Sequence, residues 1–172
     1  MHALVVVSHP DPKSLTHAVA RAYAEGVAAS GDHSTEIADL AAEGFQPAFG
    51  QADATAYLLQ APLPADVLRE QQRIDRADAL VLVYPVYWWS FPGQLKGWID
   101  RVFSNGWAYD ERPDGSLGKR LGHLPIHLIG IGGADGGPMR GTATTRRCAR
   151  RSTTASSISA ARRCAPRSSW SM

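Results

Sequence analysis

Two short stretches of almost unbroken apolar residues constrain the fold most, ALVVVS at positions 3–8 and ADALVLVYP at positions 77–85. A strand with one face in water alternates apolar and polar side chains, and these stretches do not alternate. Each is therefore expected to be a strand buried on both faces, which is typical of a parallel sheet covered by helices. Two weaker strands are expected at residues 34–40 and 123–133, with the more polar stretch 34–40 toward an edge of the sheet.

Three helices are expected between these strands, at residues 14–31, 64–77 and 92–105. The first is rich in alanine and amphipathic, and Ser14 is a suitable N-cap for it. Pro64 and Pro92 stand near the first turn of the other two, where a proline is tolerated. The remaining stretches are expected to be irregular loops, residues 41–63 and residues 107–120.

The alternation of strands and helices predicts an α/β fold with a doubly wound parallel sheet in a single domain. In such a sheet the ligand lies beyond the carboxyl ends of the strands. Three loops are expected at that edge and are called the rim loops below: HPDPKSLT at 9–16, PVYWWSFP at 85–92 and GIGGADGG at 130–137.

The first rim loop leads into a helix start that carries Lys13 and the hydroxyls of Ser14 and Thr16. These groups and the free backbone N–H groups of a first helical turn suit a phosphate. The loop contains no glycine, so it is neither a Walker A loop nor a dinucleotide-binding fingerprint. A capped helix without a ligand is the alternative interpretation.

The second rim loop carries three large aromatic residues, Tyr87, Trp88 and Trp89, where a strand is expected to end. Their flat and rigid surfaces could stack on a planar heterocycle. Alternatively, the indoles pack beneath the loop as core or form a dimer contact. In the third rim loop, Gly132 and Gly133 allow close approach of a ligand, or simply a turn.

Little in the sequence indicates catalysis by the protein's own side chains. His9 is interpreted as a structural hydrogen-bonding residue. No metal site is expected from the six histidines, and Cys148 and Cys164 lie near the C-terminal end. No Ser-His-Asp or Cys-His set is indicated by position. A reaction carried by a bound planar cofactor is the most compatible chemistry.

Three blocks, SHPDPKSLTHAVA (8–20), VYPVYWWSFPGQLKGWIDRVF (83–103) and LIGIGG (128–133), together with WAYD (107–110), resemble the flavodoxin-like NAD(P)H quinone oxidoreductase family. The resemblance covers roughly residues 1–137. It implies a sheet with strand order 2-1-3-4-5 and a bound FAD, with FMN as the alternative. It also implies ping-pong transfer of two electrons, as hydride, from NAD(P)H to quinone-like acceptors. Relatives are usually homodimers whose active sites span both subunits.

The resemblance further implies which residues surround the flavin. The phosphate and ribityl groups would lie against His9, Lys13, Ser14, Leu15 and Thr16. The isoalloxazine would lie beside Pro85, Val86, Tyr87, Trp88 and Trp89, and would be approached by Ile131, Gly132 and Gly133. Trp107 and Tyr109 match aromatic residues that line the acceptor pocket from the partner subunit in relatives.

Two other functions stay open from the sequence. Some relatives are ancillary subunits of potassium-efflux transporters, which implies a regulatory role with peripheral contact to a transporter. The other is a flavodoxin-type electron carrier, which is disfavoured because the domain lacks strong acidity. The chain begins without a basic leader and has no apolar run near the roughly 20 residues of a membrane span, so a cytoplasmic location is expected.

Residues 139–172 differ in character from residues 1–138. They hold eight of the 18 basic residues, all arginine, and no Asp or Glu, so residues 1–138 carry ten basic residues against 16 acidic ones. The segment shows no apolar period and has low-complexity character. Reading the gene one base earlier from Met139 permits a continuation with family character. Residues 139–172 are therefore interpreted as a frameshifted, disordered tail that follows an incomplete flavodoxin-like domain at residues 1–138.

The alternative for this tail is a genuine basic arm that binds nucleic acid or membrane. Nucleic acid is not expected as a partner, because Trp170 is the only aromatic residue among the arginines. If a fifth strand is missing, the strand at 123–133 becomes an exposed apolar edge and the chain should be poorly soluble or bind flavin weakly.

Overall fold

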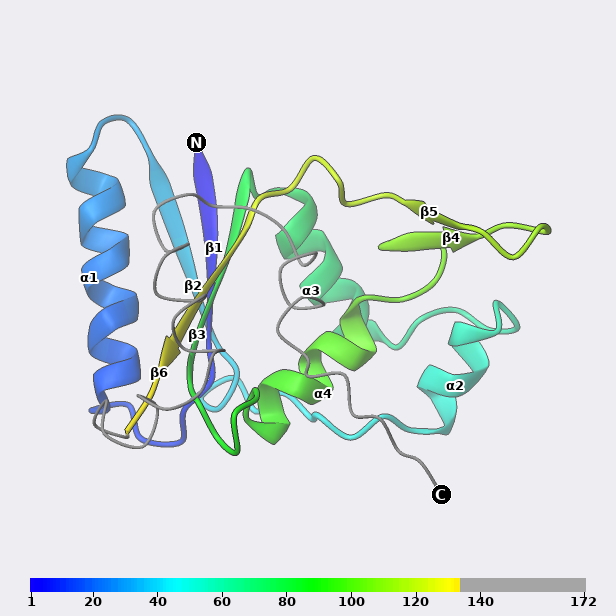
Figure 1. Cartoon of the computed structure of the whole chain (residues 1–172), viewed down its shortest axis with the longest axis horizontal. Helices are drawn as coiled ribbons and strands as arrows, with labels where there is room; N and C mark the ends of the chain where they lie inside the picture. Colours follow the sequence, from blue (N-terminus) through cyan, green and yellow to red (C-terminus); the bar gives the residue numbers. More distant parts are fainter. Residues whose placement is uncertain (134–172) are drawn as a thin grey trace, which may run out of the picture. The chain divides into compact units, whose positions relative to one another are not determined.

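The computed structural model of the chain describes residues 1–133. Four strands form one parallel sheet in the order β2-β1-β3-β6 (Figure 1). In that order they are β2 (Ser34–Asp39), β1 (His2–Val7), β3 (Ala79–Pro85) and β6 (Ile126–Ile131). The α/β class and the first four positions of the expected strand order are confirmed, and the two most apolar strands lie at the centre.

Helices cover both faces of this sheet (Figure 1). On one face α1 (Leu15–Ala29) packs through Ala20 on alternate residues of the central strands, Val5, Val7, Val81 and Val83. On the other face α3 (Ala65–Asp75) and α4 (Gly93–Val102) pack on Leu4, Val6, Leu80 and Leu82. Successive side chains of a strand point to opposite faces, so the unbroken apolar stretches are what both layers of helices require.

The helix starts follow the predicted capping. Ser14 precedes α1 in an extended conformation, and its Oγ accepts a hydrogen bond from the backbone N–H of His17 at 3.3 Å. Pro64 and Pro92 are the N-cap residues of α3 and α4, so each proline lies just outside its helix. A proline in that place removes no intrahelical hydrogen bond.

Two stretches that were predicted to be irregular contain regular structure, and that part of the prediction is wrong. Residues 41–63 include the short helix α2 (Gln51–Tyr57). A helix of this length is too short to show a period in the sequence. It is held instead by Asp53, whose carboxylate accepts hydrogen bonds from the N–H of Gly50 at 2.8 Å and from Nε of Arg101 at 2.9 Å.

Residues 107–120 include a small antiparallel pair, β4 (Tyr109–Glu111) and β5 (Leu117–Lys119). A tight turn joins them, in which the N–H of Gly115 donates to the carbonyl of Arg112 at 2.8 Å. Gly115 takes a positive φ of 77° there, which a glycine adopts without strain.

Within the described residues, β6 is an edge strand of the sheet, because β3 is the only strand that pairs with it. Leu128 of β6 is 49% exposed. The predictions of a missing fifth strand and of a disordered tail refer to residues that lie outside those described. None of the helices in residues 1–133 is long and apolar enough to cross a membrane.

Candidate functional site

The rim loops leave the same edge of the sheet. Val7 of β1 is paired with Val83 of β3, and Pro85 at the end of β3 is paired with Ile131 at the end of β6. Figure 1 shows the loop into α1, the loop from β3 to α4 and the end of β6 at one end of the sheet. The loops are thus gathered as predicted, although residues 134–137 of the third loop lie outside the described residues.

The second rim loop is a tight hairpin turn. Tyr87 and Ser90 exchange backbone hydrogen bonds of 3.1 and 3.0 Å, and Trp88 and Trp89 form its tip with φ of 49° and 60°. Positive φ at both central residues defines a type I′ turn, where asparagine and glycine are preferred and a bulky residue is strained. Strain of this kind is concentrated at functional sites in proteins.

The two indoles at this tip face solvent. Trp88 is 90% exposed and Trp89 is 78% exposed, and their ring centroids lie 6.0 Å apart with planes tilted by 55°. The alternative in which the indoles pack beneath the loop as core is therefore wrong. Two exposed indoles on a strained turn form a rigid apolar surface that suits a planar ligand.

The first rim loop is ordered by its own hydrogen bonds. The N–H of Asp11 donates to Nδ1 of His9 at 3.0 Å, and the Asp11 carboxylate accepts from the N–H of Lys13 at 2.9 Å. His9 is therefore a structural hydrogen-bonding residue in this structure, as interpreted from the sequence. Thr16 is only 2% exposed, so its hydroxyl does not lie on the open surface beside Ser14.

The third rim loop approaches the second closely. The N–H of Val86 donates to the carbonyl of Ile131 at 2.9 Å. A Cβ at Gly130 would lie 3.1 Å from the Val86 side chain, which is tight, whereas one at Gly132 or Gly133 would meet nothing within 4 Å. Within the described residues, the space beside Gly132 and Gly133 is therefore open.

A hydrogen-bonded chain that the sequence did not indicate joins the start of α1 to the end of β2. Oγ of Ser14 lies 2.9 Å from Nδ1 of His17, and Nε2 of His17 lies 2.7 Å from Oδ2 of Asp39. Burial opposes ionisation of Asp39. The hydrogen bonds from His17, Ala42 and Ala41 outweigh that effect and hold the pKa of the carboxyl below its ordinary value. The three-residue separation of Ser14 and His17 at a helix start was the one sequence signal for this contact.

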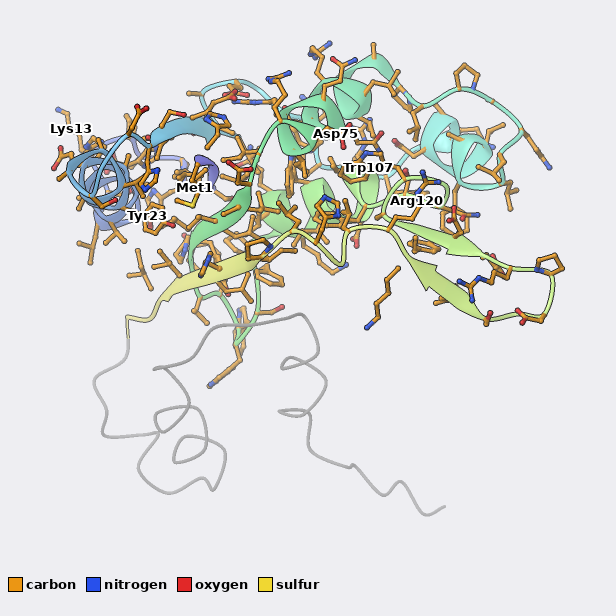
Figure 2. All side chains as sticks on the ribbon, turned by 90° about the horizontal axis from the view of Figure 1, so that it is seen from above. Met1, Lys13, Tyr23, Asp75, Trp107 and Arg120 are labelled. Atoms are coloured by element: carbon orange, nitrogen blue, oxygen red, sulfur yellow. The ribbon has the colours of Figure 1, made fainter. Side chains whose placement is uncertain are left out.

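Trp107 and Tyr109, the acceptor-pocket candidates, do not lie at the rim loops of the same chain. The indole N–H of Trp107 donates to Asp75 at 3.0 Å, and Figure 2 shows these two side chains close together at the end of α3. Tyr109 belongs to β4, which Figure 1 shows away from the ends of β1 and β6. Burial, followed by a hydrogen bond with Tyr57, raises the pKa of Tyr109 to about 12, so the phenol is neutral near pH 7.

A family model described as the flavodoxin-like fold matches residues 1–147. The chain belongs to this flavodoxin-like family. The resemblance seen in the sequence ended at Gly137. The match to the family model extends ten residues further, to residue 147.

Two curated relatives of this flavodoxin-like chain are informative. Ribosyldihydronicotinamide dehydrogenase [quinone] of Mus musculus is 32% identical over 147 residues, covering 76% of this chain and 63% of the relative. The glutathione-regulated potassium-efflux system ancillary protein KefF of Enterobacter sp. (strain 638) is 43% identical over 65 residues, covering 38% of this chain and 37% of the relative. The chain thus spans less than two thirds of the length of both relatives.

Two solved structures extend the comparison. The NAD(P)H:quinone oxidoreductase from Methanothermobacter marburgensis is 33% identical with a TM-score of 0.75, covering 86% of this chain and 74% of that chain. The general stress protein 14 of Treponema denticola, solved in complex with FMN, is 27% identical with a TM-score of 0.51, covering 78% of this chain and 64% of that chain. The flavodoxin-like chain is therefore similar in sequence and fold to proteins named as quinone oxidoreductases.

Proposed function

We propose that this chain is a flavin-dependent oxidoreductase that passes two electrons, as hydride, from NAD(P)H to a quinone or a related small acceptor. The observation that carries the proposal is the strained turn of Trp88 and Trp89, exposed at the carboxyl edge of the sheet, the same end at which α1 starts (Figure 1). This edge is where parallel α/β sheets bind their ligands. The names of the relatives in Mus musculus and Methanothermobacter marburgensis support the reaction.

The residues at the rim fit a flavin. Lys13, Ser14 and the N–H groups of the first turn of α1 would hold the phosphates, with His9 and Leu15 around them, whereas the buried Thr16 would not reach them. Pro85 to Trp89 would supply backbone N–H groups and stacking surface to the isoalloxazine, and Ile131, Gly132 and Gly133 would approach its other edge. FAD is the proposed form and FMN the alternative; the FMN complex of the Treponema denticola protein supports a flavin in either form.

A flavin bound here would supply the hydride chemistry, and the protein would supply geometry. The indole-bearing turn and the Ile131–Gly133 segment would hold the ring with one face open to solvent. Nicotinamide and acceptor would occupy that open face in turn, which is a ping-pong mechanism. We propose a cytoplasmic homodimer in which Trp107 and Tyr109 line the acceptor position of the partner's site.

The test compares the wild-type chain with Trp88→Ala and Trp89→Ala. Each protein is mixed with FAD or FMN, the bound flavin is measured by visible absorbance, and oxidation of NADPH by menadione is followed at the nicotinamide band. Loss of one stacked indole should weaken flavin binding about fivefold, because such aromatic contacts contribute on the order of 1 kcal/mol. Leu117→Ala is the matched control, an exposed apolar residue on β5 that should leave binding unchanged.

A wild-type chain that binds neither flavin would contradict the proposal. Bound flavin without NADPH oxidation would instead favour a second candidate, a regulatory subunit of a potassium-efflux system. The local match to the KefF ancillary protein is the observation that favours this candidate.

The frame hypothesis for residues 139–172 concerns the gene rather than the site. Resequencing the codons for Gly136 to Met139 decides between a real frameshift mutation and a sequencing error. An unambiguous frame that matches the chain would refute a sequencing error as the cause.

A further inference from the structure

The hydrogen-bonded chain formed by Ser14, His17 and Asp39 has a property that simple capping does not require. Capping needs only the 3.3 Å bond from the N–H of His17 to Oγ of Ser14. The same Oγ also lies 2.9 Å from the ring atom Nδ1 of His17, and the ring is anchored at Nε2 by Asp39. His17 is 6% exposed, so its ring cannot satisfy these atoms with bulk water instead.

The direction of each hydrogen bond follows from Asp39. Its Oδ1 accepts from the N–H groups of Ala41 and Ala42 at 3.1 and 3.2 Å, while its Oδ2 faces Nε2 of His17 at 2.7 Å. The pKa of this carboxyl lies below its ordinary value, so Asp39 is an ionised acceptor at neutral pH. Nε2 of His17 must therefore carry a hydrogen whether the ring is neutral or charged.

The charge of His17 then decides where the Ser14 hydroxyl points. In a neutral ring Nδ1 has no hydrogen, so the Ser14 hydroxyl must donate its only hydrogen inward to Nδ1. In a protonated ring Nδ1–H donates to Oγ, and the Ser14 hydrogen is free to turn outward. A phosphate oxygen accepts hydrogen bonds and carries negative charge, so both the freed hydroxyl and the positive ring favour its binding.

Few other charged groups act on this ring. Asp39 faces His17 from β2, and the ring of His9 lies edge-on at 6.3 Å from the first rim loop. The central strands β1 and β3, which also pack against α1, present the valines 5, 7, 81 and 83. Among the described residues, Asp39 is the titratable group hydrogen-bonded to the His17 ring and His9 is the one in ring contact with it, while Asp11 and Lys13 lie in the same rim loop.

We propose that His17 is a positioning residue that couples binding of a flavin phosphate at Ser14 to the uptake of one proton by its own ring. This inference rests on the proposed flavin site and adds its regulation by pH. For a coupling of one proton, affinity for a phosphate-bearing flavin rises by up to tenfold for each unit of decrease in pH.

The test is titration calorimetry of the 172-residue protein with FAD in two buffers of different ionisation enthalpy, repeated at a series of pH values. The difference in measured heat gives the number of protons taken up on binding. Wild type should take up a proton, and His17→Gln, which can still donate to Asp39, should take up none and bind FAD with a pH-independent affinity. Riboflavin, which lacks the phosphate, should bind without proton uptake in both proteins. His123→Gln is the matched control, an exposed histidine whose loss should leave proton uptake unchanged.

The outcomes separate the two proposals. Proton uptake that survives in His17→Gln, disappears in His9→Gln, or is equally large with riboflavin overturns the role of His17 but leaves the flavin site standing. No FAD binding by wild type at any pH overturns both. If His17→Gln fails to fold, nitrogen NMR of the wild-type imidazole decides. Nδ1 should change from an unprotonated to a protonated nitrogen when FAD is added, and an unchanged Nδ1 signal overturns the coupling.

Discussion

At the scale of single residues, the tip of the second rim loop combines exposure with strain. A side chain with a Cβ in the left-handed region costs roughly 1–2 kcal/mol, and Trp88 sits there at φ 49° while 90% exposed. Its indole gains almost nothing from burial within the chain. The strain is thus unexplained by folding and is consistent with a surface kept for a ligand.

Trp88→Gly should therefore stabilise the fold while weakening flavin binding. Glycine relieves the strain, and after its larger loss of chain entropy the net gain should be about 1 kcal/mol in the free energy of unfolding. The measurement is urea unfolding followed by far-UV circular dichroism. Trp88→Ala is the control, because alanine removes the indole but keeps the Cβ and its strain. Equal stability of the two variants would contradict the argument.

The residues of the site were predictable to different degrees. The aromatic turn was found because three large residues follow a strand whose apolar character is unambiguous. Thr16 was predicted beside Ser14 but is buried, because a loop sequence does not reveal which side of the first helical turn faces the core. The contact of His17 with Asp39 depends on where the edge strand β2 ends beside β1, a register that a short polar strand does not reveal.

At the scale of secondary-structure elements, α4 carries the contacts that hold the helical layer together. A Cβ at Gly97 would lie 2.1 Å from the carbonyl oxygen of Pro47. The backbone of α4 is therefore so close to that of Pro47 that only a glycine fits at position 97. Gly97→Ala should lower the free energy of unfolding by about 3 kcal/mol, because the added Cβ forces the backbones of α4 and Pro47 apart. Gly93→Ala, where a Cβ meets nothing within 4 Å, is the control on the same helix and should not destabilise the protein. Similar urea midpoints for the two variants would contradict the steric requirement for glycine at position 97.

Arg101 is the second anchor of α4. Its guanidinium is 7% exposed and contacts Asp53 of α2 at 2.9 Å, Asp66 of α3 at 2.6 Å and the carbonyl of Gln46 at 2.7 Å. Arg101→Met leaves the buried Asp53 without a cation, which should cost about 3–5 kcal/mol in chemical unfolding. Lys96→Met breaks only an exposed pair with Asp100 and should cost well under about 1 kcal/mol. A loss as small for Arg101→Met as for Lys96→Met would show that the network does not stabilise the fold.

This network of ion pairs also explains why α2 was not predicted from the sequence. The helix is fixed by an ion pair between Asp53 and a residue 48 positions away, not by a local period. The hairpin β4–β5 was missed for a similar reason, since each strand has three residues. The long apolar strands and α1 were predicted because their signal is local, whereas these elements depend on tertiary contacts.

At the scale of the whole molecule, two paired carboxyls predict how stability responds to acid. Burial raises the pKa of Asp66, but the hydrogen bond and charge of Arg101 outweigh it, and the pKa is lowered from 3.8, as it is for Asp39. A carboxyl with a lowered native pKa binds fewer protons when folded, so its stabilisation is present above about pH 4 and is lost as the pH falls through the native value. Urea unfolding at a series of pH values should show this decline, with a shallower slope for Asp66→Asn. Parallel curves for the two proteins would contradict the assignment.

The edge strand β6 predicts how chains associate with one another in solution. Among the described residues β6 has a partner on one side only, and Leu128 adds an apolar side chain that is 49% exposed on this strand. An apolar edge strand is a template for pairing with another chain, and an edge lysine opposes such pairing. Leu128→Lys should therefore reduce light scattering by concentrated protein and leave the circular dichroism spectrum unchanged. Leu117→Lys, which places the same charge on the 62% exposed Leu117 of the hairpin, controls for net charge alone. If both variants reduce scattering equally, the edge of β6 is not the surface through which the chains associate.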